Sequence, residues 1–189
     1  GYDDEWIKEA EKRGLRNLPS TPDALPHMLD EKNIQLYAQH KVLSRSEIEA
    51  RYEVGLETYS KTINIEARTM LDMARKDILP AVSSFEGDLA AEINEKEASG
   101  LALDCTYEKD TLQSAASLAS DMYARVRDLE SAERKAAGIT DSLELARFYR
   151  DTVLPAMDAL RVPADELEVI TGAQYWPFPT YGELLFGVK

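Results

Sequence analysis

The chain has 189 residues and a net charge of −13, with 44% apolar and 30% charged residues, as in an ordinary folded globular domain. Its negative charge repels phosphate backbones and anionic lipid, so neither nucleic-acid binding nor membrane binding is expected. No apolar run approaches the roughly 20 residues that span a bilayer, and no secretion signal opens the chain. The single cysteine, Cys105, cannot form an internal disulfide, which agrees with the reducing cytoplasm. Because the chain begins without Met and already in a helical pattern, we expect a fragment of a longer protein.

Residues 1–45 are predicted to form short helices and turns. The first segment places apolar residues among charges and predicts an amphipathic helix that ends near Gly14. Three prolines then divide the chain into turns and short helical pieces, and Thr21 before Pro22 resembles a helix cap. Asp30 is expected to cap a helix that runs to about residue 40.

Residues 46–98 are predicted to form one long spine helix, capped by Ser44 or Ser46 and kinked near Pro80. Apolar residues recur along one face in steps of four, four and three. That stripe consists of Ile48, Tyr52, Leu56, Tyr59, Ile63, Ala67, Met70, Ala74 and Ile78. A second stripe holds Val54, Ile65, Leu71 and Met73. A helix with two apolar sides is expected to pack against more than one neighbour.

Residues 86–110 are mostly acidic and are predicted to form a polar tip with a loop around Ser99 and Gly100. Residues 108–160 are predicted to form a helical hairpin. Its first helix has apolar residues in alternating steps of three and four, the seam of a left-handed bundle. The seam comprises Leu112, Ala115, Ala119, Met122, Val126, Leu129 and Ala136, with Glu133 as the polar exception.

The second helix of the hairpin begins at a capping-box pattern, Asp141 with Glu144 three residues on. Residues 161–189 are predicted to hold short helices, one from Pro163 to about Ile170, and an aromatic tail. The matching segments ILPAV and VLPAM, which contain Pro80 and Pro155, suggest similar kinks. Strand signals are poor. The sequence therefore predicts one all-α domain, an elongated bundle of long antiparallel helices with short helices at both ends.

Motifs that carry chemistry are scarce in this sequence. There is no glycine-rich phosphate loop, and neither His27 nor His40 has a carboxylate three residues before it, as a di-iron bundle requires. Cys105 follows Asp104, whose charge opposes thiolate formation. The polar residues of the spine favour a solvated or ion-paired face over a buried site, with Glu57–Lys61 and Arg68–Asp72 as helical pairs. No catalytic, cofactor-binding or metal-binding residue is therefore predicted.

The chain ends in YWPFPTYGELLFGVK, an apolar and proline-stiffened stretch. Three interpretations stay open: a ligand for a groove that binds polyproline, a tail that caps its own core, and a segment that docks on a partner. Trp176, Phe178 and Tyr181 are the candidate packing or interface anchors. The prolines lower the entropy cost of either docking.

Three separated segments carry a resemblance to a known family: GYDDEWIKEAEKRGLRNLPSTPDALPHMLDEKNIQLYAQHKVLSRSEIEARYE, YSKTINIEARTMLDMARKDILPA and YWPFPTYGELLF. Together they resemble the C-terminal region of type III glutamine synthetase, the long-chain bacterial form. The resemblance implies a parent enzyme that joins glutamate and ammonia with ATP and a divalent metal, Mg²⁺ or Mn²⁺. It also implies a ring of identical subunits. The family's catalytic motifs lie upstream, so no catalytic role is carried onto residues of this chain.

These considerations lead to a preferred hypothesis and two alternatives. In the first, the chain is a non-catalytic C-terminal domain, inactive alone, that packs on the catalytic domain of its own chain and on neighbouring subunits of a homo-oligomer. The first alternative is a stand-alone helical module that binds another protein. The second alternative, a metal-dependent helical enzyme, requires tight metal binding, which the scarcity of histidine disfavours.

Overall fold

The computed structural model describes residues 4–187, and every regular element in that range is a helix. The structure is 80% helical, which confirms the all-α prediction. Contacts divide the chain into two compact units. Unit 1 comprises Gly1–Ile63 with Ala136–Asp151, and unit 2 comprises Asn64–Lys135 with Thr152–Lys189. The units are described separately below, and a single folding domain stays a prediction.

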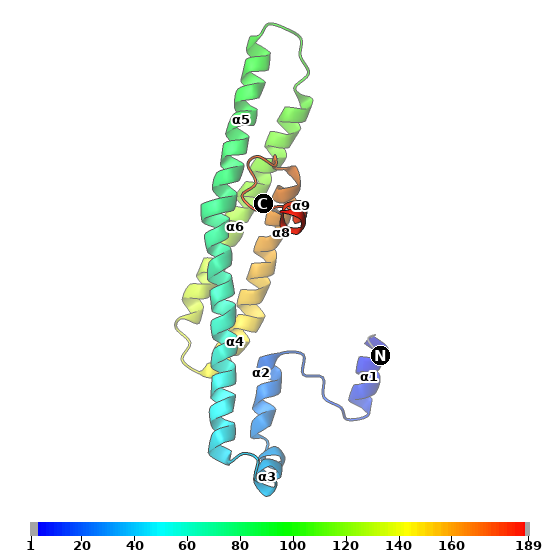
Figure 1. Cartoon of the computed structure of the whole chain (residues 1–189), viewed down its shortest axis with the longest axis vertical. Coiled ribbons are helices and arrows are strands. Elements are labelled where there is room, and N and C mark those ends of the chain that lie inside the picture. The colour runs from blue at the N-terminus through cyan, green and yellow to red at the C-terminus, as the bar shows by residue number, and fades with distance from the viewer. Residues whose placement is uncertain (1–3, 188–189) are drawn as a thin grey trace. The chain divides into compact units, whose positions relative to one another are not determined.

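Unit 1 is built from short helices around the beginning of a long one (Figure 1). Its elements are α1 (Asp4–Lys12), α2 (Thr21–Ala24), the 3₁₀ helix η1 (Leu25–Leu29), α3 (Glu31–Gln39), the start of α4 (Arg45–Met73), and α7 (Ser142–Phe148). Leu25 lies against α4 so closely that a Cβ on Gly55 would be 2.9 Å from its Cδ1 atom. Arg150 reaches α2 through an ion pair with Asp23. Short elements are thus fixed by a few specific contacts.

The predicted helix ends of unit 1 are largely correct. Gly14 follows α1 with φ +80°, a conformation that glycine adopts without strain. Ser44 begins α4 in a reciprocal cap, in which its N–H donates to Glu47 Oε2 at 2.7 Å and its Oγ accepts from the Glu47 N–H at 3.4 Å. Asp30 occupies the N-cap position of α3, but its side chain makes no capping hydrogen bond. The cap of α2 is Ser20 and not Thr21, which is already helical.

Unit 2 is made of long helices that lie alongside one another (Figure 1). Its elements are the rest of α4, the π-helical turn η2 (Ala74–Ile78), α5 (Leu79–Ala98), α6 (Thr106–Ala136), α8 (Leu154–Ile170) and α9 (Tyr181–Phe186). A second π-helical turn, η3 (Tyr149–Val153), leads into α8. The loop between α5 and α6 contains Ser99 and Gly100, as predicted.

The polar tip of unit 2 is tied together by ion pairs. Lys96 on α5 lies 2.5 Å from Glu108 on α6, and Lys109 on α6 lies 2.6 Å from Glu97 on α5. Below these pairs, Leu89 and Ile93 turn inward and are buried. The acidic composition of this segment therefore accompanies a regular pair of helices joined by a short loop.

The first apolar stripe of the spine is buried or half-buried along its whole length, and the seam of α6 likewise faces inward. The second stripe is a wrong prediction for three of its four members, since Val54 is 59%, Ile65 65% and Met73 37% exposed. Leu71 alone is buried in that set. One broad apolar face therefore suffices for the packing of this helix, and the remaining apolar side chains stay in contact with water.

The two LPA segments share a local structure. Pro80 and Pro155 each occupy the second position of an α-helix that directly follows a five-residue π-helical turn. Proline has no N–H to donate, and its ring clashes with the carbonyl four residues earlier, so a widened turn accommodates it. The predicted break before Pro163 is wrong. That residue is fully buried within α8, which continues to Ile170.

Candidate functional site

The tail that follows α8 begins with a turn that is anchored by Tyr175. Its ring lies 5.3 Å from the ring of Phe85, and its hydroxyl donates a 2.5 Å hydrogen bond to Asp88 on α5. This bond to a carboxylate raises the pKa of Tyr175. Gly172 leaves room for this ring, because a Cβ there would lie in tight contact with it, at 3.3 Å. The start of the tail is therefore packed on its own unit.

The three predicted anchors divide into two groups. Trp176 and Phe178 are half-buried and make an edge-to-face contact, with ring centroids 6.2 Å apart. Tyr181 is 83% exposed, although it lies only three residues beyond Phe178. The tail thus packs against its own helices up to Phe178 and leaves them from there on.

Trp176 and Phe178 form part of an apolar groove of about 510 Å³ in unit 2, which we call the methionine groove. Four of the five methionines in the chain line it. Its main apolar lining comprises Ile65, Met70, Met73, Ala74, Ile78, Met122, Met157, Leu160, Ala164, Trp176 and Phe178. Glu66, Thr69, Arg161, Asp165 and Glu168 complete it. Grooves of this composition are typical of protein contacts.

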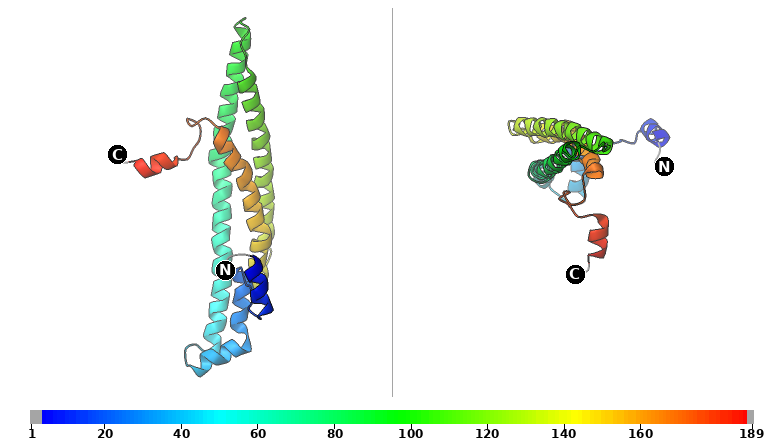
Figure 2. Two further views of the ribbon diagram at one scale, coloured as in Figure 1. Left: turned by 90° about the vertical axis from the view of Figure 1, so that its right-hand side faces the viewer. Right: turned by 90° about the horizontal axis from the view of Figure 1, so that it is seen from above.

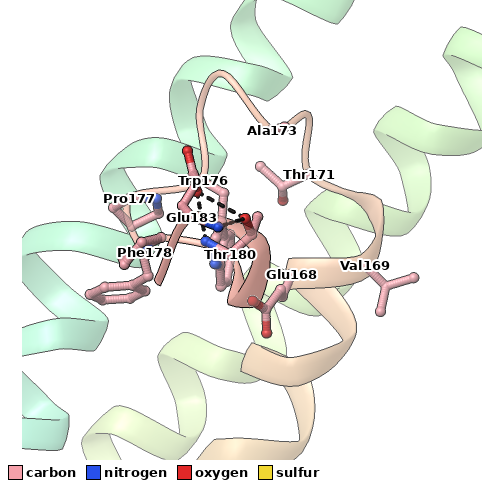
Figure 3. Close-up of a pocket in the computed structure, with 10 residues that line it drawn as sticks. Glu168, Val169, Thr171, Ala173, Trp176, Pro177, Phe178, Thr180 and Glu183 are labelled. Carbon is pink, nitrogen blue, oxygen red and sulfur yellow. Dashed lines mark hydrogen bonds between the residues drawn. The ribbon is translucent and has the colours of Figure 1, made fainter. Parts of the chain in front are cut away.

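A second hollow of about 820 Å³ lies between the end of α8 and the tail, and we call it the tail pocket (Figure 3). It shares Trp176, Phe178 and Glu168 with the methionine groove. Thr171 Oγ1 and Trp176 Nε1 are buried in the tail pocket without a hydrogen-bond partner in the protein. Buried polar atoms normally have partners, so these two groups are available to an acceptor that enters the pocket.

Helix α9 stands clear of the other helices of unit 2 in both views of Figure 2. Its start is well defined, because Thr180 Oγ1 accepts from the Glu183 N–H at 3.3 Å and the Glu183 carboxylate accepts from the Thr180 N–H at 2.7 Å. This reciprocal pattern is a capping box. Its large side chains are exposed: Tyr181 83%, Leu184 66%, Leu185 72% and Phe186 81%.

Because a capping side chain stabilises the first turn, Thr180→Ala is expected to weaken α9 by about 1 kcal/mol. Carbon chemical shifts and amide exchange across residues 181–186 measure that loss. Thr180→Ser keeps the hydroxyl and is the matched control. Unchanged helicity in Thr180→Ala would show that the box does not hold the helix.

Glu133, the polar exception in the α6 seam, is half-buried. It accepts a 2.5 Å hydrogen bond from Asn64 Nδ2 through Oε2, while Oε1 is buried without a partner in the protein. Burial raises the pKa of Glu133, and nearby Arg68 and the Asn64 bond oppose that rise only in part. Burial therefore disfavours the charged carboxylate in this seam relative to a carboxylate in water.

Because the pKa of Glu133 is higher in the folded chain, the folded state binds this proton more tightly than the unfolded state. Protonated Glu133 stabilises the folded state fully below the ordinary glutamate pKa of about 4.3. This stabilisation is lost as the pH rises through the raised pKa of Glu133 in the folded chain. Glu133→Gln is expected to stabilise unit 2 by roughly 0.5–1 kcal/mol at pH 7 and to flatten this pH dependence. The free energy of unfolding, measured by denaturant titration from pH 4 to 8, tests both effects, with Gln at the exposed Glu66 (Glu66→Gln) as the control variant. An unchanged pH profile would contradict the assignment.

The two histidines and the cysteine have different surroundings. His27 lies in a polar cluster, with Nδ1 3.2 Å from Asp30 Oδ2, and His40 is exposed at the end of α3. Cys105 is a buried free thiol before α6. Among the described residues, no group of three or more histidine, cysteine or carboxylate side chains could hold a metal ion. No helix in the same range is long and apolar enough to cross a membrane.

The polar residues of the spine form the expected salt-linked face. Lys61 lies 2.5 Å from Glu57, which confirms that helical pair. Asp72 pairs with Lys76 at 2.7 Å and not with the predicted Arg68. These side chains are exposed, so their arrangement supports the helix surface and does not create a buried polar site.

The sequence analysis did not predict two features of the tail and the groove beside it. Tyr175 was not among the predicted anchors, although it makes the tail's most specific contacts. The methionine groove was also missed. The i, i+3 spacing of Met70 and Met73 was a local signal for it, but Met122 and Met157 join them only through the folding of α6 and α8.

The helices and surfaces described above define an all-α domain with open apolar contact surfaces. A family model described as the glutamine synthetase C-terminal domain matches residues 1–97, and the chain belongs to this family. It is 41% identical over 189 residues to a glutamine synthetase of Butyrivibrio fibrisolvens, covering 100% of this chain and 27% of the relative.

Two further relatives agree with this family. The chain is 31% identical over 190 residues to a type-3 glutamine synthetase of Dictyostelium discoideum, covering 98% of the chain and 26% of that protein. It is 31% identical over 193 residues to a glutamine synthetase of Bacteroides fragilis (strain YCH46), with the same coverage. The chain spans about a quarter of the length of these relatives. The resemblance seen in the sequence is confirmed.

Proposed function

We propose that this chain is the C-terminal helical domain of a longer, cytoplasmic glutamine synthetase. The parent would form glutamine from glutamate and ammonia with ATP. Support comes from the family and from three relatives that carry this name. ATP and the divalent metal ion, Mg²⁺ or Mn²⁺, would bind in the part of the parent outside this chain.

We infer that the domain's own role is structural, in packing against the catalytic domain and against neighbouring subunits of a homo-oligomer. The observation that carries this proposal is the apolar side of α1. Trp6 is 42% and Ile7 44% exposed, and the helix stands apart from the rest of unit 1 (Figures 1 and 2). Large apolar side chains that stay in water on an amphipathic helix usually mark a contact surface.

The test places Trp6→Ser together with Ile7→Ser in the intact parent enzyme, with Lys8→Ser as the control on the charged side of α1. We expect the double variant to weaken subunit assembly, measured by light scattering after size exclusion, while the control assembles normally. Normal assembly of the double variant would remove α1 from the proposed interface.

The 189-residue chain alone is expected to make no glutamine and to hydrolyse no ATP when supplied with glutamate, ammonia, ATP and Mg²⁺ or Mn²⁺. Either activity in the isolated chain would overturn the non-catalytic role. A coupled assay for phosphate release, together with direct detection of glutamine, measures both reactions.

A stand-alone helical interaction module is the second candidate, and the open methionine groove favours it. The two proposals differ in what precedes residue 1. A natural reading frame that contains a catalytic domain upstream supports the first, and a frame that begins at this chain supports the second.

A further inference from the structure

The methionine groove has the properties of a binding site for an amphipathic helix. Methionine side chains are unbranched and polarisable, so they adapt to the shape of an apolar ligand. The groove is open to solvent, since Ile65 is 65% and Met73 37% exposed, whereas its floor residue Met122 is fully buried. An adaptable apolar surface over a fixed floor suits a helix with apolar anchors.

Helix α9 carries the matching pattern of anchors. Tyr181, Leu184 and Leu185 are spaced i, i+3 and i+4, so they share one face of the helix. All three are more than 60% exposed. Glu183, the one charged residue of α9, lies on the opposite side of the helix, where it closes the capping box. The helix can therefore bury its apolar face and leave its charge in water.

The tail connects this helix to the groove by a very short tether. Trp176 and Phe178 already line the groove, and α9 begins at Tyr181. So short a connection gives the helix a high effective concentration at its own groove. Pro177 and Pro179 restrict the tether, which reduces the conformational entropy that docking removes.

We propose that α9 docks in the methionine groove of its own chain. Tyr181, Leu184 and Leu185 then contact methionines of α4 and α8, and the open arrangement of α9 is the undocked state. The ligand class of the groove is a short helix with aromatic or aliphatic anchors at i, i+3 and i+4. This contact lies within the chain and is independent of the parent's activity and assembly.

Methyl NMR of the full 189-residue chain labelled with ¹³C-methyl methionine tests the docking. In the double variant Leu184→Ser with Leu185→Ser, the resonances of Met70, Met73 and Met157 are expected to move by more than their linewidths. Met28 in unit 1 and the buried Met122 report whether the fold is intact, and their resonances are expected to stay. Val162→Ser, an exposed change on α8 outside the groove, is the matched control. Resonances of Met70, Met73 and Met157 that do not move in the double variant would overturn the proposal.

A second measurement separates the chain's own α9 from that of another copy. In a chain labelled at both methionine and leucine methyls, we expect cross-relaxation between α9 and the groove. In a mixture of chains that are labelled either at methionine or at leucine, we expect none. Cross-relaxation in the mixture would show exchange of α9 between copies and would contradict docking within one chain.

Discussion

Leu56→Ala is expected to lower the free energy of unfolding by about 3 kcal/mol, the largest effect of any single change considered for unit 1. Leu56 is completely buried on the first apolar stripe of α4. It follows Gly55, where an added Cβ would lie 2.9 Å from the Leu25 Cδ1 atom. Removing the isobutyl group of Leu56 loses apolar burial and leaves a cavity.

Val54→Ala on the same helix is the matched control, because Val54 is 59% exposed. It is expected to change the free energy of unfolding by less than about 0.5 kcal/mol. Denaturant titrations followed by circular dichroism compare the two variants. Equal losses would mean that both stripes of the spine are buried, as the sequence predicted, and that the single-faced packing of α4 is wrong.

Truncation of the chain after Gly172 is expected to destabilise unit 2 by roughly 2–3 kcal/mol. The removed tail contributes the ring of Tyr175 against Phe85, the hydrogen bond from Tyr175 to Asp88, and the half-buried rings of Trp176 and Phe178. Each half-buried aromatic residue is worth about 1 kcal/mol, which is part of the value for full burial.

A chain that ends after Pro179 is the control, since it keeps these three aromatic residues and lacks only α9. It is expected to keep the stability contributed by Tyr175, Trp176 and Phe178 and to lose only the contribution of α9. Thermal unfolding and proteolysis at the α8 end of unit 2 measure the difference. If both truncated chains were as stable as the full chain, the tail would not clamp unit 2.

The sequence predicted the helices of this fold well because their periodicity is strong. The first stripe of α4 and the seam of α6 are long regular patterns, and the cap at Ser44 has its partner Glu47 three residues on. The continuation of α8 through Pro163 was not predicted, because proline usually ends or kinks a helix, whereas Pro163 lies fully buried within α8.

The candidate site was only partly predictable, because most of its arrangement depends on tertiary packing. An aromatic cluster indicates a contact surface, and Trp176 and Phe178 of that cluster are half-buried in the structure. The sequence does not show that Tyr175 points to Phe85 and Asp88 while Tyr181 faces solvent. Nor does it show that methionines from three helices share one groove. Those facts arise from tertiary packing.

We propose that this chain serves a glutamine synthetase as a structural domain. The most direct measurement compares the intact parent enzyme with a form that lacks the segment corresponding to residues 1–189, in subunit assembly by mass and in glutamine formation. We expect the shortened enzyme to fail to assemble normally. Assembly and activity that both match those of the intact enzyme would contradict it.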